Sequence, residues 1–208
     1  MIARAPVSGS LNLILSSRLG LVSVPQAGPA SGLADGEAAF DRDGARELLG
    51  ALGGNLGMTL LAPREDAFPE TGAAAEAAPA FPDAAVGKAL EGLDVVWMHG
   101  GEPVAAFVME TGTGWWEGLR RLADLLALHP KLKAALYVVS LPGLKAGLLA
   151  EINRPVYRLL KRPLGETVRI LDWKRLQSEV NELGDRVRYL KAEFLEGISE
   201  VVEPPAER

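Results

Sequence analysis

The most constraining feature of this sequence is a run of hydrophobic segments that begins at Leu93. Two β-favouring runs, LDVVWM and VAAFVME, are joined by HGGEP, whose Gly100–Gly101 pair is typical of a hairpin turn. The amphipathic stretch from Trp115 to His129 then predicts a helix, which Pro130 ends. A nearly all-apolar segment, ALYVVSLP, predicts a strand that is buried on both faces.

The same region continues with further segments of regular structure. A helix is expected from Gly143 to Asn153, and TVRILDW reads as a last strand. The order strand, strand, helix, strand, helix, strand indicates an α/β fold that begins with one hairpin. We therefore expect a mixed sheet flanked by helices, with a long C-terminal helix.

The residues before this core carry weaker signals. Short β-favouring pieces occupy 11–15 and 19–24, and DRDGARELLGALGGNLG predicts a helix that Asp43 can cap. MTLLAP resembles a strand, and residues 70–85 are expected to form a loop. The expected organisation is an N-terminal strand and loop region over 1–40, a core over 41–173 and a helical extension over 174–208.

The C-terminal segment has a heptad pattern. Large apolar residues recur at alternating spacings of four and three, at Leu176, Val180, Leu183, Val187, Leu190 and Phe194. This seam fits a two-stranded coiled coil, and so a homodimer or protein partner bound through 176–201. A long helix docked on its own domain explains the same pattern, and both interpretations stay open.

Composition excludes several classes of protein. The 208 residues include no cysteine, which rules out disulfides, thiolate metal sites and cysteine nucleophiles. No apolar run reaches the roughly 18 residues that a membrane-spanning helix needs, so a cytoplasmic protein is expected. The net charge of -5 provides no overall basic field, although lysines and arginines crowd the C-terminal third.

The central motifs, taken together, resemble a known superfamily. LDVVWMHGGEPVAAFVMETGTGWWEGLRRLADLLALHP is similar to the core of the PD-(D/E)XK, or restriction-endonuclease-like, superfamily. LGMTLLAPREDAF, YVVSLP, INRPVYRLL and VRILDWKRL fit the same pattern, so the resemblance covers roughly residues 48–176. It implies a mixed sheet of the restriction-endonuclease-like type.

The resemblance also implies a catalytic metal site. In that superfamily an Asp at the start of one strand and a Glu on the next hold a divalent cation, usually Mg²⁺, which activates water for attack on a phosphodiester. Asp94 matches the aspartate, and Glu110 is the acid retained on the second strand. These two residues are the candidate catalytic and metal-binding pair, with Glu47 or Asp66 as possible helpers.

The match is incomplete at the strand that should carry the second ligand. Val108 stands where the first Glu of the motif belongs, and a valine cannot bind a metal. No lysine follows Glu110 within eight positions. The sequence thus favours a catalytically compromised nuclease-like protein that binds nucleic acid or a partner protein, in a defence or repair assembly.

Two other interpretations of these acids remain. The chain could be an active Mg²⁺-dependent nuclease that uses Asp94 and Glu110, or an oligomeric scaffold in which both acids are structural. Nucleic-acid contacts are expected from basic and aromatic side chains near the presumed cleft, at Arg120, Arg121, Arg154, Arg158, Lys161 and Trp116.

Overall fold

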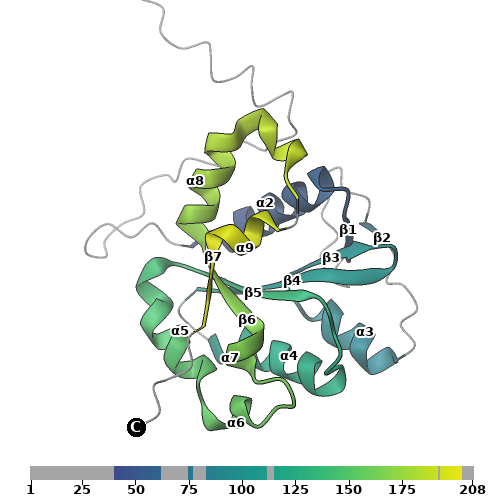
Figure 1. Ribbon diagram of the computed structural model, residues 1–208, viewed down its shortest axis with the longest axis vertical. Coiled ribbons are helices and arrows are strands. Elements are labelled where there is room, and N and C mark those ends of the chain that lie inside the picture. Colours follow the sequence, from purple (N-terminus) through teal and green to yellow (C-terminus); the bar gives the residue numbers. More distant parts are fainter. Residues whose placement is uncertain (1–39, 62–74, 77–82, 112–114, 192, 203–208) are drawn as a thin grey trace, which may run out of the picture. The chain divides into compact units, whose positions relative to one another are not determined.

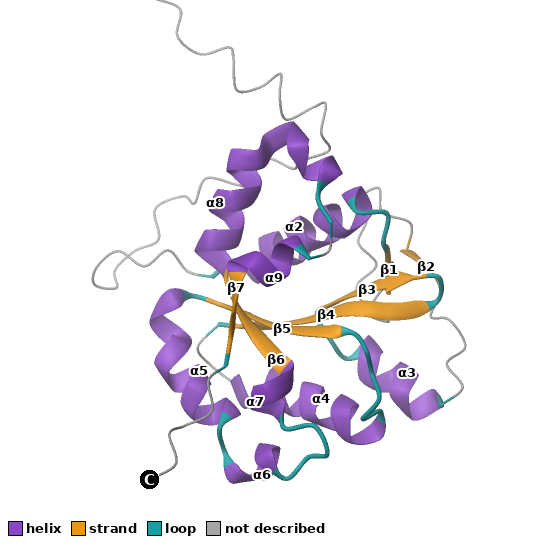
Figure 2. Ribbon diagram, in the orientation of Figure 1, coloured by secondary structure: helices purple, strands orange, loops and turns teal. Residues whose placement is uncertain are grey.

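The structure, a computed structural model, describes residues 40–61, 75–76, 83–111, 115–191 and 193–202. In this part of the chain, seven strands form one mixed sheet in the order β2-β1-β3-β4-β5-β6-β7 (Figures 1 and 2). The predicted α/β class, a mixed sheet flanked by helices, is confirmed. The predicted strands at 11–15 and 19–24 lie outside the described residues.

The middle of the sheet joins a hairpin to a parallel unit. β3 (Val95–His99) pairs antiparallel with β4 (Glu102–Glu110), and Gly100 and Gly101 adopt φ of 60° and 81° in the turn between them. That backbone conformation is one that L side chains rarely adopt. β5 (Ala135–Ser140) and β6 (Val168–Asp172) then follow parallel to β4.

Short strands complete both edges of the sheet. β1 (Thr59–Leu61) pairs with β3 on one side and with β2 (Ala75–Glu76) on the other. At the opposite edge, β7 (Ser199–Val201) runs antiparallel to β6.

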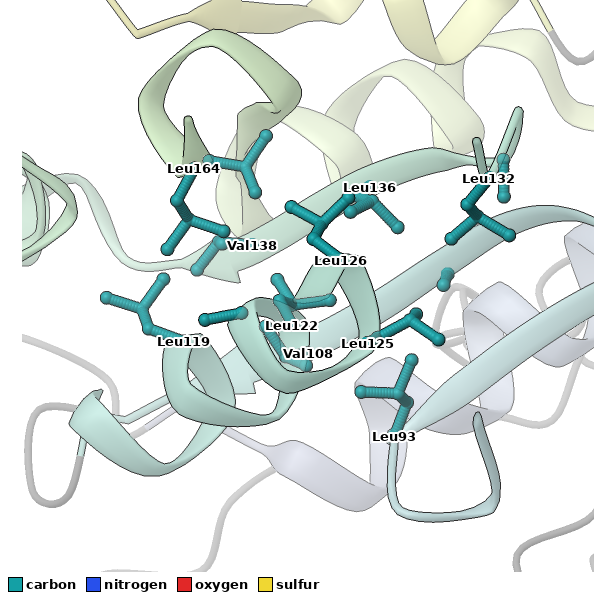
Figure 3. Close-up of a cluster of buried hydrophobic side chains, with 14 of the residues drawn as sticks. Leu93, Val108, Leu119, Leu122, Leu125, Leu126, Leu132, Leu136, Val138 and Leu164 are labelled. Carbon is teal, nitrogen blue, oxygen red and sulfur yellow. The ribbon is translucent and has the colours of Figure 1, made fainter. Parts of the chain in front are cut away.

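Helices between the parallel strands cover one face of the sheet. They are α4 (Trp115–Leu128), α5 (Lys145–Ile152), α6 (Pro155–Arg158) and α7 (Leu164–Thr167), and α3 (Ala84–Glu91), which precedes β3, lies on the same face. The short 3-10 helix η1 (Pro142–Leu144) follows β5, and its Leu144 packs against the core of the other face. Leu119, Leu122 and Leu126 of α4 pack against Val108 and Val138 (Figure 3). Each fully buried leucine adds about 2 kcal/mol of hydrophobic stabilisation.

The other face is covered by helices from both ends of the described chain. α2 (Arg42–Asn55) buries Leu49 and Leu52, whereas α8 (Trp173–Leu183) and α9 (Phe194–Ile198) cover the β5–β6 side. The Phe107 ring lies beneath them, stacked on Tyr137 and in tilted contact with Trp97. Both faces are therefore buried, as the apolar sequence of β5 predicted.

The C-terminal segment is helical from Trp173 to Tyr189, because α8 runs into the 3-10 helix η2 (Gly184–Tyr189). The heptad pattern, however, does not form a coiled-coil arm. Leu176, Val180 and Val187 lie buried in the chain's own core. The pattern arises because an amphipathic helix docked on a sheet needs the same apolar stripe as a coiled coil.

Several local expectations need correction. Asp41, and not Asp43, caps α2, because its Oδ1 accepts a hydrogen bond of 3.0 Å from the Gly44 N–H. α3 and β7 had no counterpart in the sequence interpretation. Among the described residues, no helix combines the length and the apolar character that a bilayer crossing requires.

Substitution of Gly53 tests the packing of α2 on the sheet. A Cβ added at Gly53 would lie 2.6 Å from Nε1 of Trp97, a fully buried ring whose N–H donates to the Leu49 carbonyl. We predict that Gly53→Ala lowers the free energy of unfolding by about 1–3 kcal/mol through overpacking. Urea denaturation followed by circular dichroism measures the change.

The matched control is Gly197→Ala in α9. A Cβ at Gly197 meets nothing within 4 Å, and alanine is the better helix former, so this variant should be as stable as the parent or more so. Equal stability of the two variants would contradict the tight contact between α2 and Trp97.

Candidate functional site

The hairpin brings Asp94 and Glu110 to one end of the sheet. Asp94 directly precedes β3 and Glu110 ends β4. The Asp94 N–H donates to the Phe107 carbonyl at 3.1 Å, and the Met109 N–H donates to Oδ2 of Asp94 at 2.8 Å. Because side chains alternate along a strand, both acids lie on the face of the sheet that α4 covers.

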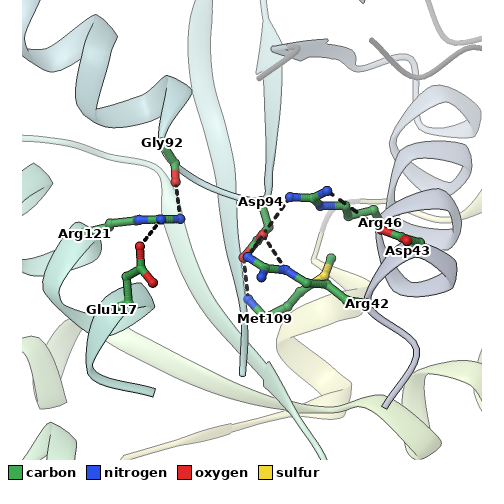
Figure 4. A network of polar contacts seen from close by, with 8 residues as sticks. All are labelled: Arg42, Asp43, Arg46, Gly92, Asp94, Met109, Glu117 and Arg121. Carbon is green, nitrogen blue, oxygen red and sulfur yellow. Dashed lines mark hydrogen bonds and ion pairs between the residues drawn. The ribbon is translucent and has the colours of Figure 1, made fainter. Parts of the chain in front are cut away.

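Asp94 is a buried carboxylate held by two arginines of α2 (Figure 4). Its Oδ1 accepts hydrogen bonds from Nε and Nη2 of Arg42, at 3.0 Å and 2.5 Å, and from Nη2 of Arg46 at 3.2 Å. The Asp94 side chain is 3% exposed, whereas that of Arg42 is 44% exposed. Both carboxylate oxygens are therefore occupied by N–H donors.

Glu110 is almost as buried as Asp94 but has fewer hydrogen-bond donors around its carboxyl group. It is 3% exposed, and among the described residues its Oε1 has no hydrogen-bond partner. Burial raises the pKa of Glu110 from 4.5 to about 8, and the neighbouring Asp94 adds to the shift, while the Gly118 N–H and Arg42 oppose it. At neutral pH this carboxyl group is mostly protonated.

The two acids line a small polar pocket of about 50 Å³. Its other walls come from Arg42, Met109 and Thr111, and from Glu117, Gly118 and Arg121 of α4. Arg121 is fixed there by a hydrogen bond of 2.8 Å to the Gly92 carbonyl and by an ion pair with Glu117 (Figure 4). The pocket thus contains nearly balanced charges and room for little more than water.

Gly118 makes the approach of α4 possible. A Cβ there would lie 2.4 Å from Oε1 of Glu110 and 3.1 Å from Cβ of Val108. Val108 itself is fully buried in the core under α4. The position that the resemblance reserves for a metal ligand is therefore occupied by hydrophobic packing.

This arrangement does not fit a resident Mg²⁺ ion. Mg²⁺ requires several oxygen ligands in near-octahedral geometry, and both oxygens of Asp94 already accept N–H groups. Glu110 offers one unpartnered oxygen on a carboxyl group that is largely neutral at pH 7. Within the described residues, no group of three His, Asp or Glu side chains is arranged to hold a metal.

The expected helper acids do not change this conclusion. Glu47 belongs to α2 but is not among the residues that line the pocket. Asp66 lies outside the described part of the chain.

The structure separates the expected nucleic-acid contacts into two groups. Arg121 lines the pocket, and Arg120, one residue earlier on α4, pairs with Asp124 at 3.7 Å. Arg154, which pairs with Glu151 at 2.7 Å and directly precedes α6, belongs to the second group. The side chain of Trp116 lies outside the described parts.

Arg158 and Lys161 belong to the second group, at the far end of the sheet. Arg162, next to Lys161, donates a hydrogen bond to the carbonyl of Leu132, which comes just before β5 begins. Glu110 instead pairs with Ser140, where β5 ends. The six-residue length of β5 puts roughly 20 Å between these two places.

Arg42 and Arg46 are the site residues that sequence reasoning missed. They are four residues apart, so they lie on one face of α2. That spacing was visible in the sequence, but their partner Asp94 is 52 and 48 positions away. The spacing therefore could not identify it.

An α/β sheet with two acids at one end of its hairpin is consistent with the restriction-endonuclease-like class. The family model of the Type II restriction enzyme NmeDI C-terminal domain matches residues 75–202, which is more than half of the chain. The chain therefore belongs to that family. Comparison with curated proteins and with solved structures gave no match.

The raised pKa of Glu110 predicts a specific pH dependence of stability. A carboxyl group whose pKa is higher in the folded state stabilises the fold below its unfolded value of 4.5, and this contribution is lost as the pH rises to about 8. We predict that the free energy of unfolding decreases over this range, and that Glu110→Gln removes the Glu110-dependent part of the decrease. Denaturation curves at a series of pH values measure it.

Glu117→Gln is the control, because Glu117 lines the same pocket with a side chain that is 55% exposed. This variant should keep most of the parent's pH dependence, because the charge of Glu117 is the smallest of the contributions to the raised pKa of Glu110. A Glu110→Gln protein with the same slope as the parent would show that Glu110 ionises normally.

Proposed function

We propose that this chain is a restriction-type nuclease domain that binds DNA and does not cleave it. The observation that carries the proposal is the ion pair of Asp94 with Arg42 and Arg46, which occupies the carboxylate that a nuclease of this class would use for its metal. The family's name, that of a Type II restriction enzyme, supports DNA as the bound polymer and host defence as the context.

Three features of the pocket support a compromised centre. Val108 stands where the resemblance expects a carboxylate, Glu110 is largely neutral at pH 7, and the cation that acts on Glu110, Arg42, is already engaged by Asp94. A guanidinium has a fixed charge and donates hydrogen bonds, so it can hold a phosphate. It has no coordination position for water, and therefore it cannot generate a hydroxide as Mg²⁺ does.

One observation favours a second candidate, an active Mg²⁺-dependent nuclease that uses Asp94 and Glu110. Oε1 of Glu110 is unpartnered among the described residues, and the Arg42 side chain is exposed enough to swing away from Asp94. Displacement of Arg42 by a cation would then bring both acids onto one metal.

The two candidates differ in a cleavage assay. We predict that the full chain binds a fluorescent DNA duplex with an affinity that falls as salt rises, because phosphate contacts release counterions. Plasmid DNA incubated with Mg²⁺ or Mn²⁺ should stay intact. Cleavage by the parent that Glu110→Ala abolishes would instead establish the active nuclease, and cleavage that survives this substitution would exclude Glu110 from the mechanism.

A metal titration tests the ion pair directly. Removing both arginines leaves the buried Asp94 uncompensated, which costs several kcal/mol, and a divalent cation can relieve this cost. We predict that Mn²⁺ raises the melting temperature of Arg42→Ala/Arg46→Ala but leaves that of the parent unchanged. Differential scanning calorimetry with and without Mn²⁺ measures the shift.

The control adds Asp94→Asn to the same double variant. This triple variant has no buried charge to compensate, so Mn²⁺ should no longer stabilise it. Stabilisation of the parent by Mn²⁺ would contradict the view that the arginines occupy the cation's place.

A further inference from the structure

The end of the sheet opposite the acid pocket carries a concentrated positive charge. Two segments, 129–133 and 154–163, contain six lysines and arginines and no Asp or Glu, in a chain whose net charge is -5. The hydrogen bond from Arg162 to the Leu132 carbonyl holds the two segments side by side. We call this surface, formed by Lys131, Lys133, Arg158 and Lys161, the basic edge.

The cations of the basic edge are exposed and unengaged. Neither an ion pair nor a side-chain hydrogen bond joins any of the four to another residue that the structure describes. Most other arginines of the described chain form ion pairs or hydrogen bonds. Examples are the ion pairs Arg42–Asp94, Arg120–Asp124 and Arg175–Glu179. Unpaired cations that repel one another raise the energy of the free protein, and a polyanion relieves this repulsion.

The backbone of both segments that carry these cations is anchored by buried side chains. Tyr157 and Leu164 are buried in the core on the α4 side, and Leu132 is buried between Lys131 and Lys133. A cavity of about 410 Å³ is lined by Lys131 and Lys133, together with Leu128 and His129. Asp83 and Glu102 form its far wall and give that side the opposite charge.

We propose that the basic edge binds the sugar–phosphate backbone of duplex DNA, as a second contact away from the acid pocket. This inference rests on the proposed DNA-binding function and extends it. The phosphates of a duplex complement the four exposed cations that hydrogen-bonded segments bring together at this end of the sheet, and such contacts add affinity without reading sequence.

A lipid surface suits the basic edge less well. Val156 and Leu159, 57% and 87% exposed, stand among the cations. Membrane-surface helices, however, bury a long continuous apolar face, and α6 has only four residues. In contact with DNA, two isolated apolar side chains can pack against sugars and base edges.

The test measures how DNA affinity depends on salt. The full chain is titrated with a mixed-sequence DNA duplex labelled with a fluorophore, and the slope of log affinity against log salt is compared for two double variants. Arg158→Ala/Lys161→Ala removes two cations of the basic edge. Lys174→Ala/Lys191→Ala removes two exposed lysines on the α8 side and η2 end, and changes the net charge equally.

We expect the slope to become shallower by roughly 1 for each cation removed from the basic edge, and to stay unchanged in the control pair. Lys131→Ala/Lys133→Ala should reproduce the effect. Equal slopes in the parent and in both basic-edge variants, with DNA still bound, would overturn this inference and leave the proposed function standing. An equal loss in the control pair would also overturn it, because the effect would then reflect net charge alone.

Failure of the parent to bind duplex DNA would instead remove the proposed function, and the inference with it. Vesicles of anionic phospholipid form a separate arm. Binding of the parent to these vesicles that is lost in Arg158→Ala/Lys161→Ala, without any loss of DNA affinity, would assign the basic edge to membranes and contradict the proposal.

Discussion

The buried carboxylate of Asp94 is the constraint around which this end of the molecule is organised. A charged group that is 2% exposed is very unfavourable unless donors surround it. The hairpin supplies one donor, the Met109 N–H, and α2 supplies the guanidinium groups of Arg42 and Arg46. The same contacts hold the start of α2 against the end of the sheet, so electrostatic compensation and tertiary packing depend on one interaction.

This compensation explains why two neighbouring acids behave so differently. Asp94 accepts hydrogen bonds from Arg42 and Arg46. Glu110 is stabilised by the Gly118 N–H and by the electrostatic attraction of Arg42. The unequal sharing leaves Asp94 paired and raises the pKa of Glu110 to about 8. Arg42 and Arg46 therefore compensate mainly one of the two acids, Asp94.

The two ends of the sheet carry different sets of charged side chains for a structural reason. In parallel strands joined by helices, the carboxyl ends of all strands lie at one end of the sheet and the amino ends at the other. Glu110 and Ser140 end β4 and β5 at the first of these ends, and Lys131 and Lys133 precede β5 at the second. Side chains at the same end of the sheet lie close together, and the length of β5 separates the two ends.

Local patterns in the sequence determined much of this protein: the hairpin with its glycine turn, the amphipathic α4, the buried strands β5 and β6, and the class of fold. These features depend on periodicity and turn chemistry within a few residues. Only the tertiary structure decided that α2 delivers Arg42 and Arg46 to Asp94, and that the heptad residues of α8 and η2 pack on their own sheet. It also decided that β7 closes the edge beside β6. The arginines lie 52 and 48 positions from Asp94, and β7 pairs with β6 across the whole of α8, η2 and α9. Side-chain pairing of this kind is set by how the layers stack, which no local pattern records.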